Sequence, residues 1–116
     1  MIYALREALL LVQEEGLENV HARHRAAAEH LWEGLESLGA SARAPGYLRS
    51  PTLTTPRIPA GVDDLRVRQR LLDEYNIEIS GGFGPLAGQV WRVGLMGHSA
   101  RKENVDMLLG ALKELL

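Results

Sequence analysis

The chain has 116 residues, enough for one domain with a single core, and its 46% hydrophobic and 24% charged residues are typical of a folded globular protein and exclude a disordered one. The formal net charge of −2, with arginines and carboxylates interspersed, offers no basic surface for nucleic acid. No apolar run approaches the roughly 20 residues of a membrane span, and no signal peptide begins the chain, so we expect a cytoplasmic protein. Because cysteine is absent, we expect no disulfides and no thiolate metal sites.

Two helices are predicted in the first third of the chain. Over residues 3–15 apolar side chains recur every three or four positions, and Gly16 follows where a left-handed cap would sit. No capping residue precedes this helix, so we expect that the natural protein extends upstream of Met1. A second helix, residues 17–38, carries one apolar stripe and ends before Gly39.

The middle of the chain predicts short strands around one helix. Residues 41–43 and 52–58 are expected to be strands, the second an edge or bulged strand because Pro56 cannot donate a ladder hydrogen bond. Asp63 is placed to cap a helix over residues 64–75. The apolar positions of that helix are Leu65, Leu71, Leu72 and Tyr75.

The last third of the chain completes the sheet. Residues 77–79 predict a short strand that runs into a glycine-rich stretch at 81–85, and residues 89–96 form the clearest strand. Ser99 is placed to cap a final helix that carries one apolar stripe to Leu116. Helices with single apolar faces must cover a sheet, so we predict an α+β fold: a two-layer sandwich in which a small, mostly antiparallel sheet carries helices on one face.

Arg92 is the first candidate site residue, because it interrupts the clearest strand. Alternation gives this strand a core face with Trp91, Val93 and Leu95, and an opposite face with Val90, Arg92, Gly94 and Met96. An arginine between valines needs an anion, its planar fork matches a carboxylate, and Gly94 leaves room for a ligand. The residues alone leave open that Arg92 pairs with an internal Asp or Glu, or is simply exposed.

Five short segments carry a further pattern. They are YALREAL at 3–9, EGLEN at 15–19, NIEISGGFGP at 76–85, WRVGLMG at 91–97 and ENVD at 103–106. They resemble the C-terminal third of alanine–glyoxylate and serine–pyruvate aminotransferases, which are class V aminotransferases of fold type I, use pyridoxal 5′-phosphate and work as homodimers. The resemblance implies that residues 1–116 are the small C-terminal domain, without the large cofactor-binding domain. It also implies a parent enzyme that moves an amino group from alanine or serine to glyoxylate or another 2-oxo acid.

The resemblance implies roles for three residues. In that family the arginine of the R-[IV]-G-x-[ML]-G strand binds the substrate α-carboxylate, and here it falls on Arg92. Gly81 and Gly82 begin a segment that the family uses as a mobile element near the mouth of the substrate site, although a plain strand connection explains the glycines equally well. Related class V enzymes that act on other amines or remove sulfur from cysteine are second choices.

Transamination of this type needs a lysine that forms a Schiff base with the cofactor. The chain has only Lys102, in the first turn of the last helix, and Lys113, at its solvent-facing end, so we expect no cofactor on the isolated chain and no activity from it. The alternative is a non-catalytic interaction or regulatory module derived from such an enzyme. Exposed apolar surface on residues 3–12 and on the Arg92 face predicts self-association of the isolated chain.

The histidines give a weaker signal. His21 and His24 are one helical turn apart and His30 lies beyond, but no further ligand has suitable spacing, so we expect no metal site. His98 could approach the Arg92 site from the strand end, although histidines in loops are more often solvated.

Overall fold

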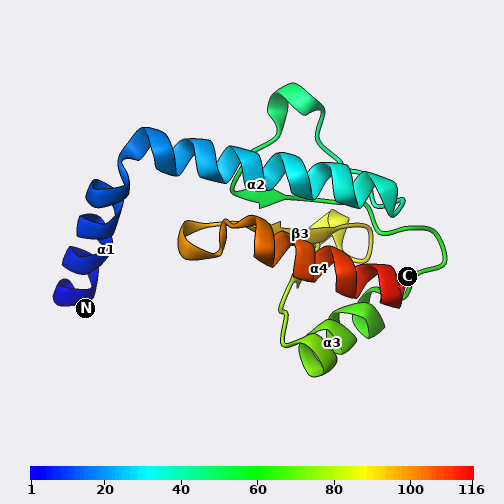
Figure 1. Cartoon of the computed structure of the whole chain (residues 1–116). Coiled ribbons are helices and arrows are strands. Elements are labelled where there is room, and N and C mark those ends of the chain that lie inside the picture. The colour runs from blue at the N-terminus through cyan, green and yellow to red at the C-terminus, as the bar shows by residue number, and fades with distance from the viewer.

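The computed structural model describes every residue of the chain, Met1–Leu116. Four helices and three short strands follow in the order α1 (Ile2–Glu15), α2 (Leu17–Ser37), β1 (Leu53–Thr54), α3 (Asp64–Tyr75), β2 (Ser80–Gly81), β3 (Trp91–Gly94) and α4 (Lys102–Leu115). Figure 1 shows α2 and α4 side by side in front of the sheet, with α3 at the lower end of α4 and α1 projecting away from the rest. None of the helices has the length and apolarity that crossing a membrane requires.

The sheet is antiparallel, and β3 is its central strand. Its order is β1-β3-β2, with Leu53 opposite Gly94 and Ser80 opposite Arg92. Alternate residues of β3 are buried and exposed, because one face of the sheet packs against the helices. The predicted α+β sandwich with helices on one face is therefore confirmed.

The core lies between that face of the sheet and three helices. Trp91 is fully buried at its centre, and Leu31 from α2, Leu71 from α3 and Leu112 from α4 are buried with it. Burying side chains of this size stabilises a fold by about 1.5–3 kcal/mol each relative to exposure. β3 is thus held rigidly by the residues that alternate with Arg92.

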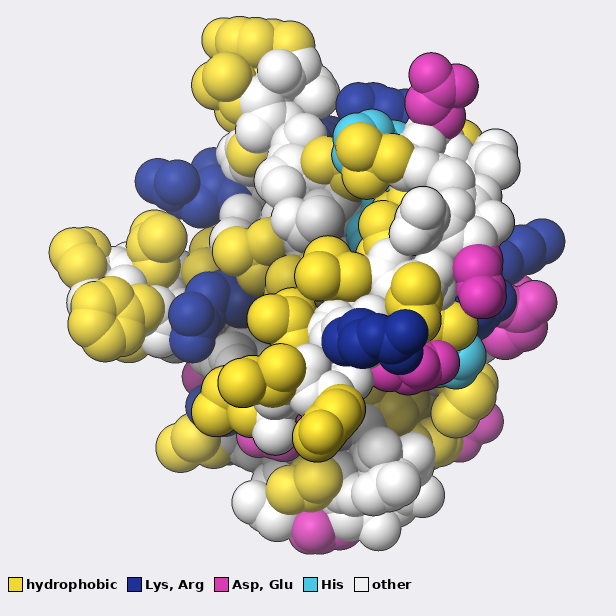
Figure 2. Space-filling model, turned by 90° about the vertical axis from the view of Figure 1, so that its left-hand side faces the viewer, with side chains coloured by type: hydrophobic (Ala, Val, Ile, Leu, Met, Phe, Trp, Pro, Cys, Tyr) yellow, Lys and Arg dark blue, Asp and Glu magenta, His cyan; other side chains and the backbone are white.

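α1 contributes nothing to this core. None of its residues is buried, and Gly16, with φ of 83°, turns the chain between α1 and α2. Figure 2, seen from the side on which α1 projects, shows hydrophobic side chains spread over much of the face. The exposed apolar residues of α1 include Ile2, Tyr3, Leu5, Leu9 and Leu11. Self-association through this surface stays a prediction.

The predicted strands are longer than the observed ones. Residues 41–43 are not a strand, because only Ala42 forms an isolated bridge, to Pro56. The strand expected over residues 52–58 has a regular ladder only at Leu53–Thr54, although its pairing resumes at Arg57, which bridges Val90 just before β3. Pro56 interrupts the ladder. It has no N–H to donate, although its carbonyl accepts a hydrogen bond from the Trp91 amide at 3.0 Å.

Two further boundaries shift. Residues 77–79 form no ladder, and the strand begins only at Ser80. The strand expected over residues 89–96 is regular only from Trp91 to Gly94, but its ends remain paired. The Ile58 amide donates to the Gln89 carbonyl at 3.0 Å, and the Leu95 amide donates to the Thr52 carbonyl at 2.9 Å. Val90, expected on the same face as Arg92, is buried, but it does not belong to the core cluster that contains Trp91 and Val93.

Helix ends follow local chemistry more closely. Asp63 caps α3 as predicted, since its carboxylate accepts a hydrogen bond from the Arg66 amide at 3.0 Å. Ser99 does not cap α4. It lies in a 3-10 turn, donates its hydroxyl hydrogen to the Met96 carbonyl at 2.8 Å, and leaves Arg101 at the cap position.

The buried face of α3 differs from the predicted one. Val67 and Leu71 are buried, whereas Leu65 and Leu72 are 69% and 44% exposed. The helix meets the core along a narrow stripe, so the outer two leucines remain on the surface. Leu116, expected on the buried stripe of α4, is 42% exposed at the chain end.

Candidate functional site

Arg92 lies on the open face of the sheet, in its central strand. Its side chain is exposed and takes part in none of the five ion pairs of the chain. The pairing with an internal carboxylate that the sequence left open is therefore absent. Its one hydrogen bond runs from Nε to the Gly81 carbonyl oxygen at 2.8 Å.

This single bond leaves the recognition end of the guanidinium free. Nε–H is satisfied by the backbone of β2, so the N–H groups on Nη1 and Nη2 have no partner in the chain. Those two nitrogens present parallel donors that match both oxygens of one carboxylate. Arg92 is thus oriented by the sheet and free to bind a small acid.

Two small residues neighbour Arg92 on the open face of the sheet. Ser80 is its cross-strand neighbour, and Gly94 follows two residues later on β3. A Cβ built on Gly94 would meet only the Met96 methyl, at 3.2 Å, so the space predicted above Gly94 is bordered by a flexible side chain. Arg92 lines none of the five principal cavities, so within this chain the site is an open surface.

Gly81 and Gly82 are both packed closely, but against different groups. A Cβ on Gly81 would lie 3.2 Å from Arg68 Nη2, whereas a Cβ on Gly82 would lie 1.9 Å from the backbone oxygen of Leu86. The Leu86 amide in turn donates to the Phe83 carbonyl at 3.1 Å. The segment after β2 therefore folds back on itself as a hydrogen-bonded turn, and its mobility near a substrate stays a prediction.

A polar cluster at the edge of the core was missed by sequence reasoning. Asp64 Oδ1 accepts hydrogen bonds from Trp91 Nε1 at 2.9 Å and from Arg68 Nε at 2.8 Å, and its Oδ2 accepts one from Arg68 Nη2 at 3.2 Å. The hydrogen bonds from Arg68, with its charge and the indole N–H, hold the pKa of Asp64 below its ordinary value despite partial burial. The four-residue spacing of Asp64 and Arg68 signals an ion pair on one helix face, but nothing local signals Trp91.

The turn after β3 is held by residues of α2. Arg23 bonds Glu15 through Nε at 2.6 Å, and its Nη1 donates to the Gly97 and Ala100 carbonyls at 2.8 and 2.9 Å. The hydrogen bonds from Arg23 lower the pKa of Glu15. His24 Nε2 accepts from the Gly97 amide at 3.1 Å, which assigns its proton to Nδ1 facing the Val20 carbonyl.

The remaining titratable candidates do not gather at Arg92. His30 Nε2 lies 2.6 Å from Asp106 Oδ1, and His98 is exposed beside Arg101. No group of three His, Asp or Glu side chains in the chain is placed to hold a metal ion. Lys102 and Lys113 are both exposed on α4.

The chain is similar over its whole length to known aminotransferases. It is 45% identical over 116 residues to (S)-ureidoglycine–glyoxylate transaminase of Bacillus subtilis, and 44% identical over 117 residues to alanine–glyoxylate aminotransferase of Mus musculus. The crystal structure of alanine–glyoxylate aminotransferase from Nostoc sp. superposes on 97% of the chain with a TM-score of 0.95 and 56% identity. The chain spans 28% to 30% of the length of these proteins and matches their C-terminal part. No family model matches it.

Proposed function

Because the chain belongs to the aminotransferases of the alanine–glyoxylate type and corresponds to their C-terminal part, we propose that it is the small domain that binds the substrate carboxylate in a pyridoxal-phosphate-dependent transaminase. One observation carries this proposal: the guanidinium of Arg92 is anchored through Nε and has a free end. Arg68 and Arg70, by contrast, each use the guanidinium fork on a carboxylate of their own helix.

Pyridoxal phosphate is implied for the full enzymes by the aminotransferase relatives, and when bound it supplies the electron sink for amino-group transfer. The 116 residues do not fit this cofactor. A Schiff-base lysine needs shielded surroundings that lower its pKa, whereas Lys102 and Lys113 are exposed. We therefore place cofactor binding outside these residues and expect the isolated chain to be inactive.

Arg92 suits both substrates of a transamination. An amino donor and a 2-oxo acceptor each carry a carboxylate next to the reacting carbon, so one arginine can hold them in turn. Binding both carboxylate oxygens fixes the direction of the bond to that carbon, and such orientation is a large part of the catalytic advantage of an enzyme site. Since β3 is anchored by buried Trp91 and Val93, Arg92 keeps this orientation during exchange of the two acids.

The chemical names of the relatives narrow the proposed substrates. The B. subtilis and mouse proteins differ in amino donor but share glyoxylate, so we propose glyoxylate or a similarly small 2-oxo acid as acceptor. Alanine or serine is the proposed donor. The exposed apolar face of α1 supports a further proposal, that the parent enzyme is a homodimer in which this face is covered.

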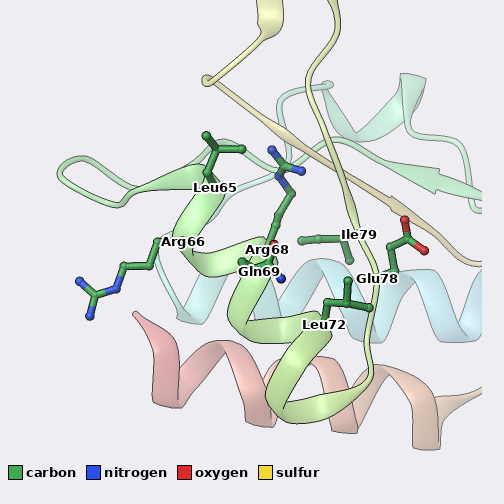
Figure 3. A pocket seen from close by; sticks show the side chains of 7 residues that line it. All are labelled: Leu65, Arg66, Arg68, Gln69, Leu72, Glu78 and Ile79. Carbon is green, nitrogen blue, oxygen red and sulfur yellow. The ribbon is translucent and has the colours of Figure 1, made fainter.

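The test uses the full-length enzyme and replaces Arg92 by alanine. Loss of a charge-assisted pair worth about 1.5–3 kcal/mol predicts a KM for the amino donor that rises roughly 10- to 100-fold, with an unchanged cofactor absorbance spectrum. Arg66→Ala is the matched control, because Arg66 is another exposed arginine whose side chain has no partner and which points away from the sheet in Figure 3. A KM that stays the same in Arg92→Ala would contradict the proposal.

A further inference from the structure

Arg68 lies on the opposite side of Gly81 from the candidate site. It extends from α3 beside Ile79 and along the segment that leads into β2, whereas its neighbour Arg66 points away from that segment (Figure 3). Its guanidinium is half-buried, and two hydrogen bonds to Asp64 fix its plane. Asp64 is itself held by the indole N–H of Trp91, which has no exposed surface. Arg68 is therefore more rigidly placed than a surface arginine.

The guanidinium of Arg68 packs directly on Gly81. A Cβ on Gly81 would meet Nη2, Cζ and Nε of Arg68 at 3.2, 3.3 and 3.4 Å, so the space that a side chain would fill is already covered by the guanidinium. Gly81 is opposite Trp91 in the ladder, which places this contact on the core side of the sheet. The carbonyl oxygen of the same glycine accepts the hydrogen bond from Arg92 Nε at 2.8 Å.

We propose that Arg68, held by Asp64 and Trp91, is a positioning residue that orients Arg92 through the backbone of Gly81. β2 is an edge strand of only two residues, so its ladder alone fixes the Gly81 peptide weakly. Covering Gly81 with a clamped guanidinium restricts that peptide and therefore the acceptor of Arg92. The inference rests on the proposed role of Arg92 in binding a carboxylate.

The experiment compares Arg68→Met, Arg92→Ala and the double variant in the full-length enzyme. Methionine keeps an apolar stem of similar reach but has no fork, so Arg68→Met should raise both the KM for the amino donor and the inhibition constant of propionate about 10-fold, with a smaller change in kcat. In the Arg92→Ala background the same substitution should change either constant less than about 2-fold, because the residue it positions is gone.

Arg70→Met is the matched control. Arg70 forms the same kind of i,i+4 ion pair on α3, with Glu74 at 2.6 Å, and has no hydrogen bond outside that pair. It should leave both constants unchanged while losing comparable stability. Where Arg68→Met does not fold, Arg68→Lys replaces it, since lysine keeps the charge but cannot form the fork, and a rise of roughly 3-fold is expected.

Two results would overturn the inference. One is an Arg68 variant with the constants of the Arg70 control, and the other is an equal rise in the presence and absence of Arg92. Both leave the proposed function intact as long as Arg92→Ala alone raises KM. An unchanged KM in Arg92→Ala would instead remove the proposed function, and the two failures are thus distinguishable.

Discussion

Replacing Gly82 by alanine tests whether the glycine-rich turn after β2 is a packed structure. A Cβ at this position would lie 1.9 Å from the carbonyl oxygen and 2.5 Å from the carbonyl carbon of Leu86, far inside the about 3.5 Å at which non-bonded atoms touch. The obstacle is backbone, so no change of rotamer relieves it. The Leu86 carbonyl must move, and it accepts the Gln89 amide hydrogen bond at 3.0 Å.

The expected cost follows from these contacts. Overpacking contributes about 1–3 kcal/mol and a weakened backbone hydrogen bond about 1 kcal/mol. The lower entropy of alanine in the unfolded chain offsets about 0.4–1 kcal/mol. The free energy of unfolding should therefore fall by about 2 kcal/mol, which lowers Tm by roughly 8 °C for a domain of this size.

Urea unfolding of the chain, followed by circular dichroism, measures this change. Gly46→Ala is the matched control, because a Cβ there has no heavy atom within 4 Å and the residue does not have a positive φ. That substitution should be neutral or slightly stabilising. If Gly82→Ala unfolds within about 0.5 kcal/mol of Gly46→Ala, the segment yields easily, and the interpretation as a mobile element is favoured over a packed turn.

Two further substitutions test the core and the acid response. Gly34→Ala places a Cβ 2.2 Å from Leu109 Cδ1, so we expect the free energy of unfolding in urea to fall by about 1–3 kcal/mol despite better helix propensity. Replacing Leu109 by alanine as well should remove this clash and recover the stability that it costs. A single variant that is more stable than the wild type would contradict the close approach of α2 and α4. The lowered pKa of Asp64 means that its charge stabilises the fold above its unfolded pKa of about 3.9 and loses this effect as pH falls through the folded value. The difference in unfolding free energy between the wild type and Asp64→Asn should thus be larger at neutral pH than at pH ~3, and an equal difference at both would refute the linkage.

Helices were predictable from the sequence because their signals are local. The bounds of α3 follow from the cap at Asp63 and from Asn76, which ends the helix with φ of 55°. Which face of α3 is buried did not follow, because Leu65 and Val67 are both apolar and only the position of the sheet decides between them.

Strands were predicted less well, since pairing joins residues that are far apart in the chain. Leu53 pairs with Gly94, so the length of β1 depends on where β3 lies and not on its own composition. The threonines and the isoleucine of residues 52–58 correctly indicated a segment that pairs with the sheet. Pro56 then interrupted the regular ladder, which resumes as an isolated bridge between Arg57 and Val90.

The candidate site shows the same division between local and distant information. Arg92 could be singled out because a charged residue in an apolar strand is unusual wherever the strand lies. The group that orients it could not, because its acceptor is a backbone carbonyl, which every residue supplies. What the sequence does carry is the glycine at position 81, whose missing side chain leaves room for Arg68. Arg68 is bound to Asp64, and Asp64 in turn accepts a hydrogen bond from Trp91, 27 residues away in the chain. Residue type therefore identifies the side chain that would meet the substrate, and only the fold identifies the side chains that hold it in place.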